Sequence, residues 1–229
     1  MQRKTKIIES IDGEIFDIEL SEDLLKKNKE IAKENKKLLE KHNILAIDIM
    51  GAIGAGKTTL ITKIVSILSK KYKIAVLCGD LTTTLDADII KSAGAEVIQI
   101  NTGKECHLDA NLVRKAIKEL PLNKIDLLII ENVGNLICPG EFVLGTHKRM
   151  VVVSVTEGPF MVVKHPYIFM EANIGVINKI ELKDVMGVEP KKLQSAMKKI
   201  KPGIKVFETS ARKNIGVELL ATFISKLLK

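Results

Sequence analysis

One short segment, residues 51–58, limits the possible fold more than any other part of the sequence. It reads GAIGAGKT and matches the pattern G-x-x-x-x-G-K-[ST] at every position. The apolar run at residues 45–50 predicts a buried strand before it, and residues 59–69 have helical periodicity after it. A strand, a glycine-rich loop and a helix in this order form the setting in which the pattern binds phosphates. The sequence therefore predicts a phosphate-binding loop at the end of a strand.

Each part of this loop has a chemical use. Glycines let the backbone turn its N–H groups toward a chain of phosphates, and the N-terminus of the following helix adds a positive dipole end. Lys57 can reach the β- and γ-phosphates, and the Thr58 hydroxyl can bind Mg²⁺. The expected nucleotide-binding residues here are Gly51, Ala52, Ile53, Gly54, Ala55, Gly56, Lys57, Thr58 and Thr59. The alternative, a glycine-rich turn followed by Lys-Thr by chance, is disfavoured by the flanking strand and helix.

Strands and helices alternate after the loop. Strands are expected at residues 73–79, 96–100, 125–133, 150–156, 174–178 and 204–209, and helices at residues 86–93 and 107–120. Strands that are almost entirely Val, Ile and Leu, separated by helices, are typical of a parallel sheet covered on both faces. We therefore predict a doubly wound α/β domain with a mainly parallel sheet over residues 44–229.

The N-terminal residues 1–43 are expected to form an appendage to this domain. Residues 1–20 alternate charged and apolar side chains and predict a short extended segment whose place in the fold is left open. Ser21 is a plausible N-cap for a Lys/Glu-rich helix over residues 24–42. Its apolar side chains recur every seven residues, so this stripe must pack on something. Packing on the chain's own sheet is the favoured interpretation, and contact with a partner protein is the alternative.

Composition narrows the class of protein. Three cysteines in 229 residues do not make a disulfide framework, which favours a reducing cytoplasm, and Cys78 is expected to be a core thiol. The net charge of +8 is spread over predicted helices, and aromatic residues are only 3%, so solvated helix faces are favoured over nucleic-acid binding. No apolar run has membrane-spanning length and no signal peptide is recognised, so no membrane partner is expected.

The carboxyl ends of parallel strands meet at one edge of the sheet, where ligands bind. Glu131 and Gly134 stand at the end of the strand at residues 125–133 and resemble the D-x-x-G element of GTPases, with Glu replacing Asp. In that element the glycine N–H binds the γ-phosphate and the acid assists Mg²⁺ or water. Together with Lys57 and Thr58, they are the expected catalytic residues.

Two later strand ends resemble elements that recognise guanine. Asn178, Lys179 and Glu181 resemble N-K-x-D, whose carboxylate accepts hydrogen bonds from guanine, although Glu181 is one methylene longer than Asp. Ser210 and Ala211 resemble the S-A-K element, whose backbone N–H meets the guanine oxygen. Three such elements in the correct order after a phosphate loop are hard to explain by chance.

Two carboxylates follow the strand at residues 73–79. Asp80 and Asp86 are candidate magnesium ligands together with Thr58. Either of them can instead serve as a turn residue or a helix cap, and Asp86 stands where an N-cap belongs.

Cysteine and histidine suggest a second site. Cys106 and His107 are adjacent after the third strand, and Cys138 follows the fourth. Two thiolates and one imidazole suit Zn²⁺ or Ni²⁺, and three ligands leave a position for water or for another chain. Each residue taken alone is more simply explained as a buried side chain, but the three together favour a metal site.

The segments NTGKECHLDA, ENVGNLICPGEF and SVTEG, together with GAIGAGKTT, resemble the hydrogenase maturation GTPase family, HypB, over residues 45–229. The resemblance implies a P-loop GTPase fold and slow, Mg²⁺-dependent GTP hydrolysis in the cytoplasm. It also implies a Ni²⁺ or Zn²⁺ site at Cys106, His107 and Cys138 and a homodimer favoured by GTP. The implied partners are a HypA-like metallochaperone and the large subunit of a [NiFe] hydrogenase.

Several features depart from this family pattern. No cysteine precedes Cys78, so no Cys-rich N-terminal nickel site is expected. The stretches at residues 141–144 (EFVL) and 158–163 (GPFMVV) contain apolar replacements where the family often has charged residues. The alternatives left open are a nickel carrier without significant turnover and a P-loop kinase acting on a small molecule. A urease-type accessory GTPase is a third, although its Cys-Pro-His arrangement is absent here.

Overall fold

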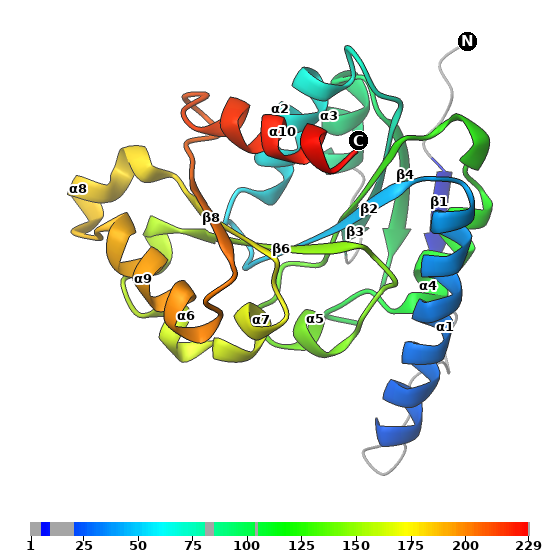
Figure 1. The fold of residues 1–229 in the computed structure, drawn as a ribbon, viewed down its shortest axis with the longest axis horizontal. Coiled ribbons are helices and arrows are strands. Elements are labelled where there is room, and N and C mark those ends of the chain that lie inside the picture. Colours follow the sequence, from blue (N-terminus) through cyan, green and yellow to red (C-terminus); the bar gives the residue numbers. More distant parts are fainter. Residues whose placement is uncertain (1–5, 10–20, 81–84, 104, 229) are drawn as a thin grey trace.

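The computed structural model describes residues 6–9, 21–80, 85–103 and 105–228. The described residues form an eight-stranded sheet in the order β1-β4-β3-β5-β2-β6-β7-β8 (Figure 1), and every neighbouring pair is parallel. The strands are β1 (Lys6–Glu9), β2 (Leu45–Met50), β3 (Ile74–Asp80), β4 (Glu96–Asn101), β5 (Leu127–Glu131), β6 (Lys148–Ser154), β7 (Ile174–Asn178) and β8 (Lys205–Glu208). The predicted parallel sheet is confirmed.

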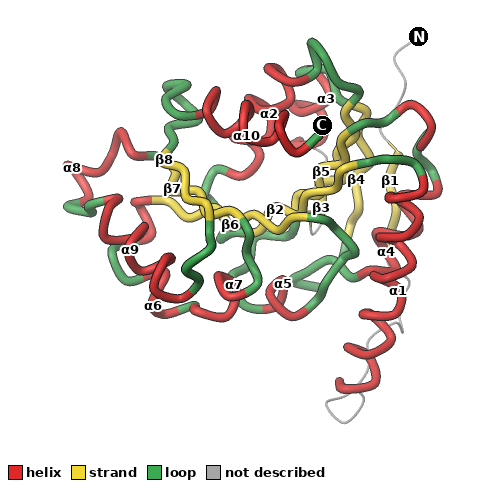
Figure 2. The backbone as a smooth tube through the Cα atoms, viewed as in Figure 1, coloured by secondary structure: helices red, strands yellow, loops and turns green. Residues whose placement is uncertain are grey.

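Helices cover both faces of this sheet, as a doubly wound fold requires. The longer helices are α1 (Ser21–Lys41), α2 (Lys57–Leu68), α3 (Leu85–Ser92), α4 (Ala110–Lys118), α9 (Pro190–Ile200) and α10 (Val217–Leu227). The short ones are α5 (Cys138–Glu141), α6 (Met161–Lys164), α7 (Pro166–Met170) and α8 (Lys183–Met186). Figure 2 shows α2, α3 and α10 on one face of the sheet, with α1, α4, α5, α6, α7 and α9 on the other. No described helix is both long and apolar enough to cross a membrane.

The buried apolar side chains form three clusters. One lies between the sheet and helices α2, α3 and α10, and it contains Cys78, which is therefore the predicted core thiol. The opposite face carries two clusters, one under α1 and α4 and one under α6, α7 and α9. Strand β2 contributes Ala46 to the first of these two and Met50 to the second. Asp48 lies between them on the same face, because side chains of a strand alternate.

The N-terminal helix α1 packs on its own domain, as favoured from the sequence. Leu39 is buried in the cluster shared with α4. Two buried asparagines of α1 also bind backbone groups: Asn28 accepts from the N–H of Ala110, and Asn35 donates to the carbonyls of Ala110 and Leu144. The described part of the first twenty residues, β1, extends the sheet beside β4. The division at residues 43 and 44 stays a prediction.

Several element boundaries differ from expectation by a few residues, and two of them have a clear local reason. The helix predicted from residue 107 begins at Ala110, because the Asp109 carboxylate accepts hydrogen bonds from the N–H groups of Asn111 and Leu112 and caps the helix there. The helical prediction for His107 was therefore wrong, and His107 lies in a loop. Strand β6 ends at Ser154 rather than residue 156, where Ser154 starts a 3₁₀ turn.

Candidate functional site

The glycine-rich loop connects β2 to α2. A side chain at Gly51 would collide with the carbonyl of Val152, and one at Gly56 would come within 2.5 Å of Asn178 Nδ2. Both glycines also have positive φ, of 153° and 90°, which favours glycine. Gly56 caps α2 without a side-chain hydrogen bond, because glycine has no side chain that could accept from the first N–H groups of the helix. A helix start of this kind suits an anion such as a phosphate.

Lys57 and Thr58 make contacts that prepare them for this role. The Lys57 ammonium donates to the carbonyl oxygens of Gly51 and Ala52, at 3.0 and 3.1 Å. The Thr58 hydroxyl donates to Glu131 Oε1 at 2.7 Å, which joins the loop to the end of β5. Hydroxyl and carboxylate oxygens are ligand types that Mg²⁺ prefers, so this pair fits the ion expected with a nucleotide.

The segment after β5 packs directly on the glycine-rich loop. A side chain at Gly134 would lie 3.0 Å from the backbone N and Cα of Ile53. The next residue, Asn135, forms an isolated antiparallel bridge with Gly51. Gly134, the residue expected to sense the γ-phosphate, is therefore already in contact with the phosphate loop in this structure.

Asn178 ties together the elements predicted to recognise guanine. Its Nδ2 donates to the carbonyl of Ala55 at 3.0 Å, and its Oδ1 accepts from Thr209 Oγ1 at 3.1 Å and from the Ala211 N–H at 3.2 Å. Only 1% of Asn178 is exposed. The structure thus brings the phosphate loop, the end of β7 and the Ser210-Ala211 turn together around one buried amide.

The two residues after Asn178 have different environments. Lys179 takes a left-handed conformation with φ of 59°. Glu181 lies in the 3₁₀ turn Ile180–Leu182, and its buried Oε2 accepts no hydrogen bond from the described residues. A carboxylate oxygen of this kind can accept from a ligand.

Glu157 belongs to this site, although it was not among the predicted site residues. Its Oε1 accepts from the Ser154 N–H at 2.8 Å, and its buried Oε2 accepts no hydrogen bond within the described chain. Burial raises the pKa of Glu157, while the Ser154 N–H and the charges of Lys57 and Lys179 oppose that rise. The carboxyl therefore lies within electrostatic reach of both lysines. The sequence feature that could have identified Glu157 is its place in the segment SVTEG, at the end of a strand.

The structure brings the predicted metal ligands together. Cys106 Sγ lies 3.0 Å from Cys138 Sγ and 3.8 Å from His107 Nδ1. The three candidate ligand atoms all lie within 4.8 Å of one another. We call Cys106, His107 and Cys138 the metal trio. They come from two separate segments, one between β4 and α4 and one after β5, and this donor set suits Zn²⁺ or Ni²⁺.

Burial sets the protonation of two members of the metal trio. It lowers the pKa of His107, with the charges of Glu105, Asp109 and Glu141 opposing, and the His107 ring packs on Phe142 at 3.9 Å between centroids. Burial, with the hydrogen bond and charge of Cys106, raises the pKa of the Cys138 thiol to about 11. At neutral pH the imidazole is therefore ready to bind a metal, whereas the Cys138 thiol must first lose its proton.

The magnesium predictions for Asp80 and Asp86 lie outside the described part of the chain, since their side chains are not described. The apolar stretch at residues 158–163 divides between core and surface. Val162 is fully buried, whereas Phe160 and Val163 are exposed.

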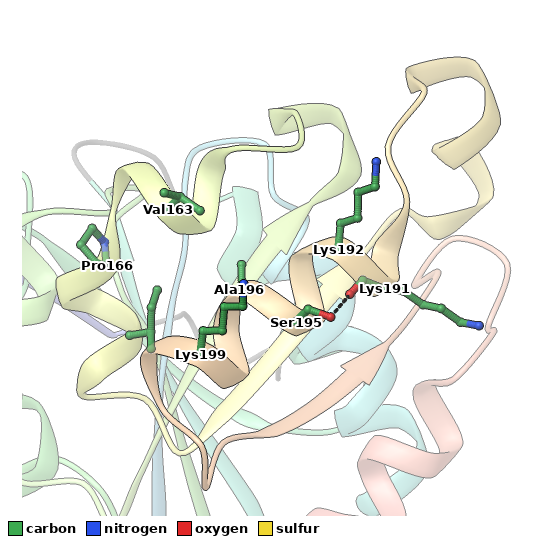
Figure 3. A pocket seen from close by; sticks show the side chains of 8 residues that line it. Val163, Pro166, Lys191, Lys192, Ser195, Ala196 and Lys199 are labelled. Carbon is green, nitrogen blue, oxygen red and sulfur yellow. Dashed lines mark hydrogen bonds between the residues drawn. The ribbon is translucent and has the colours of Figure 1, made fainter.

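A shallow groove lies between α6, α7 and α9, and Figure 3 shows Val163 and Pro166 facing Ala196 and Lys199 across it. It is lined by Val163, Pro166, Lys191, Lys192, Ser195, Ala196, Lys199 and Ile200. None of the predicted site residues lines this groove.

Comparisons with known proteins show which family the chain belongs to. A family profile described as the CobW/HypB/UreG nucleotide-binding domain matches residues 45–208. A probable hydrogenase maturation factor HypB from Methanocaldococcus jannaschii is 50% identical over 212 residues, which are 93% of this chain and 96% of that protein. HypB from Escherichia coli K12 is 36% identical over a match that covers 88% of this chain and 69% of that protein.

Solved structures agree with these matches. HypB from Archaeoglobus fulgidus superposes with a TM-score of 0.83 at 40% identity, covering 89% of this chain and 99% of that one. HypB from Helicobacter pylori, solved in complex with nickel, gives 0.84 at 34% identity and covers 88% and 95%. A LAO/AO transport system kinase, at 16% identity and a TM-score of 0.57, shares the fold. The chain belongs to the CobW/HypB/UreG nucleotide-binding family, within its HypB group of hydrogenase maturation factors.

Proposed function

We propose that the chain hydrolyses GTP with Mg²⁺ and uses its nucleotide state to control nickel or zinc at the metal trio, as a metallochaperone for [NiFe] hydrogenases. Membership of the HypB group supports the link to hydrogenase maturation and to nucleotide. The relative from Helicobacter pylori, solved in complex with nickel, supports nickel as the cargo.

The observation that carries this proposal is the path of one short segment, residues 131–138. Glu131 accepts from Thr58 at its start, and Cys138 stands at its end. Between them, Asn135 pairs with Gly51 of the phosphate loop and its Nδ2 donates to the carbonyl of Cys106 at 3.4 Å. One segment therefore contacts the nucleotide side and the metal side, so a shift at the γ-phosphate is passed on to a metal ligand.

The catalytic roles follow from the positions of the polar groups. Lys57 exchanges the carbonyls of Gly51 and Ala52 for the β- and γ-phosphates, and Thr58 with Glu131 supplies oxygens for Mg²⁺. The Gly134 N–H binds the γ-phosphate. Water attacks the γ-phosphorus, the bond to the β–γ bridging oxygen breaks, and GDP and phosphate leave. Asp80 and Asp86 remain candidates for the magnesium shell.

Guanine is the base that fits the other end of the site. The unpartnered Oε2 of Glu181 can accept from guanine N–H groups, and Asn178 holds the surrounding turns in place. Lys179, Ser210 and Ala211 complete the proposed base contacts. Adenine would leave the carboxylate without matching donors, which costs about tenfold or more in affinity.

The metal trio supplies three ligands, and a tetrahedral site takes four. We place it near a two-fold homodimer interface that GTP favours, where a second copy completes the coordination. A HypA-like metallochaperone and the hydrogenase large subunit are the proposed partners, in the cytoplasm, with neither nucleic acid nor a membrane involved. GTP hydrolysis then opens the dimer and lets nickel pass on.

Phosphate release tests the enzymatic half of the proposal. The protein is incubated with Mg²⁺ and GTP or ATP, without an acceptor. We expect slow release from GTP and at least about tenfold less from ATP. A requirement for an added acceptor would favour the kinase alternative, and no release from either nucleotide would favour a carrier that only binds nucleotide.

Linkage tests the coupling. Nickel is titrated with GDP and with a non-hydrolysable GTP analogue, and sedimentation is measured with and without nickel. Affinity for nickel should differ between the two nucleotide states, and nickel should change GTP affinity by the same factor, since coupling is reciprocal. Equal nickel affinities together with an unchanged monomer–dimer equilibrium would contradict the proposal.

A further inference from the structure

A buried ion pair lies beneath the metal trio. Asp48 of β2 is fully buried and Arg149 of β6 is 8% exposed, and they are direct neighbours across the two strands. Arg149 Nε lies 3.4 Å from Asp48 Oδ2. Removing two charges from water is costly, and such a pair is weak evidence for stability by itself. The contacts that the pair makes indicate what it does.

Arg149 reaches the segment that carries Cys138. Its Nη1 donates to the carbonyl of Gly140 at 3.0 Å, and its Nη2 donates to the carbonyl of Pro139. Both carbonyls belong to α5, which begins at Cys138. A helix of four residues leaves most of its carbonyls without helical partners, so the guanidinium fixes α5 by satisfying two of them.

The second oxygen of Asp48 reaches the other half of the trio through Asn132. Asn132 Nδ2 donates to Asp48 Oδ1 at 3.2 Å, which turns the amide so that its Oδ1 accepts from the Leu108 N–H at 3.1 Å. Leu108 directly follows His107. The same Oδ1 accepts from the Val133 N–H at 3.0 Å. One carboxylate therefore has a hydrogen-bonded route to each half of the metal trio.

The pattern of these contacts argues against a general role in holding the sheet together. Apart from the Met50 thioether, the side chains of Asp48, Asn132 and Arg149 bond only to one another and to the two trio-bearing segments, within the described residues. Burial raises the pKa of Asp48, and Arg149 and Asn132 oppose that rise, so its charge depends on the same two partners.

We propose that Asp48, Asn132 and Arg149 form a positioning group that sets the separation between Cys138 and the Cys106–His107 pair. Asp48 lies two residues before Met50, where β2 enters the phosphate loop, so the reference point for both halves is the strand that carries the nucleotide site. The inference rests on the proposed metal site. These three residues control metal affinity without contacting the metal, because they fix the positions of the ligands.

Residues that orient metal ligands typically change metal affinity by about 10- to 100-fold when they are replaced. Arg149→Met removes both bonds to α5 at similar size, and Asn132→Ala releases Leu108 while the ion pair stays intact. We expect each to weaken Ni²⁺ binding by about tenfold or more and to shift the thiolate-to-nickel absorption band. Arg149→Lys should recover only part, because one ammonium cannot replace a planar guanidinium that reaches two carbonyls and a carboxylate.

Asn173→Ala is the matched control. Its Oδ1 accepts from the backbone N–H of Arg149 at 2.9 Å, so this variant removes a backbone contact of Arg149 and leaves every side-chain bond of the positioning group in place. It should lower the melting temperature and leave the nickel absorption band unchanged. All variants are compared with the unmodified chain for GDP affinity, which should change less than about twofold, and for thermal unfolding.

The outcomes separate this inference from the proposed function. If the unmodified chain binds no Ni²⁺ or Zn²⁺, or if Cys106→Ala and Cys138→Ala leave binding intact, the metal site itself is wrong. If binding depends on both cysteines but folded Arg149→Met and Asn132→Ala keep the affinity and the absorption band, the positioning group is overturned. Should Arg149→Met fail to fold, Asn132→Ala alone decides, because it leaves no buried charge unpaired.

Discussion

The base end of the nucleotide site and the metal trio are built in opposite ways. At the base end, Asn178 is itself a predicted site residue, and its buried amide directly holds the phosphate loop and the turn at residues 209–211. In the metal trio, the ligand side chains contact one another, and polar side chains from other parts of the fold bond to the backbone of the two segments that carry them. We expect the base end to be rigid, because one of its own buried residues holds it together. The metal trio can change its geometry when the residues that hold its segments move.

The largest effect should follow from removing a trio thiolate. Cys106→Ala or Cys138→Ala should weaken nickel binding by about a hundredfold or more, since thiolates hold a borderline-soft dication and each ligand contributes roughly 3 kcal/mol. His107→Ala should cost less. Isothermal titration measures both, and GDP affinity should stay nearly unchanged. A double cysteine variant that still binds one Zn²⁺ per chain with unchanged affinity would place the site elsewhere.

Asn178→Ala is the corresponding change at the base end. It leaves the Ala55 carbonyl and the Ala211 N–H without their buried partner, at a cost of about 2 kcal/mol in the free energy of unfolding. GDP affinity should fall by roughly thirtyfold, because both turns lose their support. Chemical denaturation and GDP titration measure the two effects. A parallel loss of nickel affinity would show that the two regions are not built independently.

The pH dependence of nickel binding sharpens the contrast. With its pKa raised to about 11, the Cys138 thiol keeps its proton between pH 6 and 9, so a bound metal must displace it. His107, with its pKa lowered, is already neutral over most of that range. Nickel affinity should therefore rise with pH, by about tenfold per unit for the Cys138 proton. Titrations at three pH values, with GDP affinity as the reference, measure it, and a flat profile would contradict the assigned ligands.

The smallest expected effect concerns base selectivity. Glu181→Ala should reduce a preference of about tenfold for GDP over ADP to nearly none. Glu208→Ala is a control, because this carboxylate is exposed at the end of β8. Competition binding of the two nucleotides gives the ratio directly. Equal affinities already in the unmodified chain would remove Glu181 from the base site and favour the kinase alternative.

The sequence predicted best what depends on local pattern. The phosphate loop and seven strands follow from apolar runs and glycine spacing. The meeting of Cys106 with Cys138 follows from both segments leaving the carboxyl edge of one parallel sheet, although β3 lies between β4 and β5. The place of β1 beside β4 was not predictable, because a short amphipathic strand carries no sign of its partner. The N-terminal limit of α4 depended on Asp109, whose capping role competes with the apolar periodicity.

The positioning group shows a different limit of sequence reasoning. Asp48 stands out as a charge inside an apolar strand, but Arg149 is about a hundred residues away and its partners are backbone carbonyls. Every residue has a backbone carbonyl, so no sequence pattern identifies the two carbonyls that Arg149 binds. Glu157 was missed for a related reason, since its relation to Lys57 and Lys179 exists only after three strand ends have converged.

In the proposed mechanism, the segment from Gly134 to Cys138, which spans four residue steps, acts as a tether of limited length. Fully extended, four residue steps span about 14 Å at most, so the two ends cannot separate beyond this length when either of them moves. The proposed coupling therefore depends more on the length of this segment than on the identity of its residues. Two glycines inserted after Leu136 should leave a nucleotide site that still binds GTP and a trio that still takes up nickel. The nucleotide state of such a variant should no longer change its affinity for nickel.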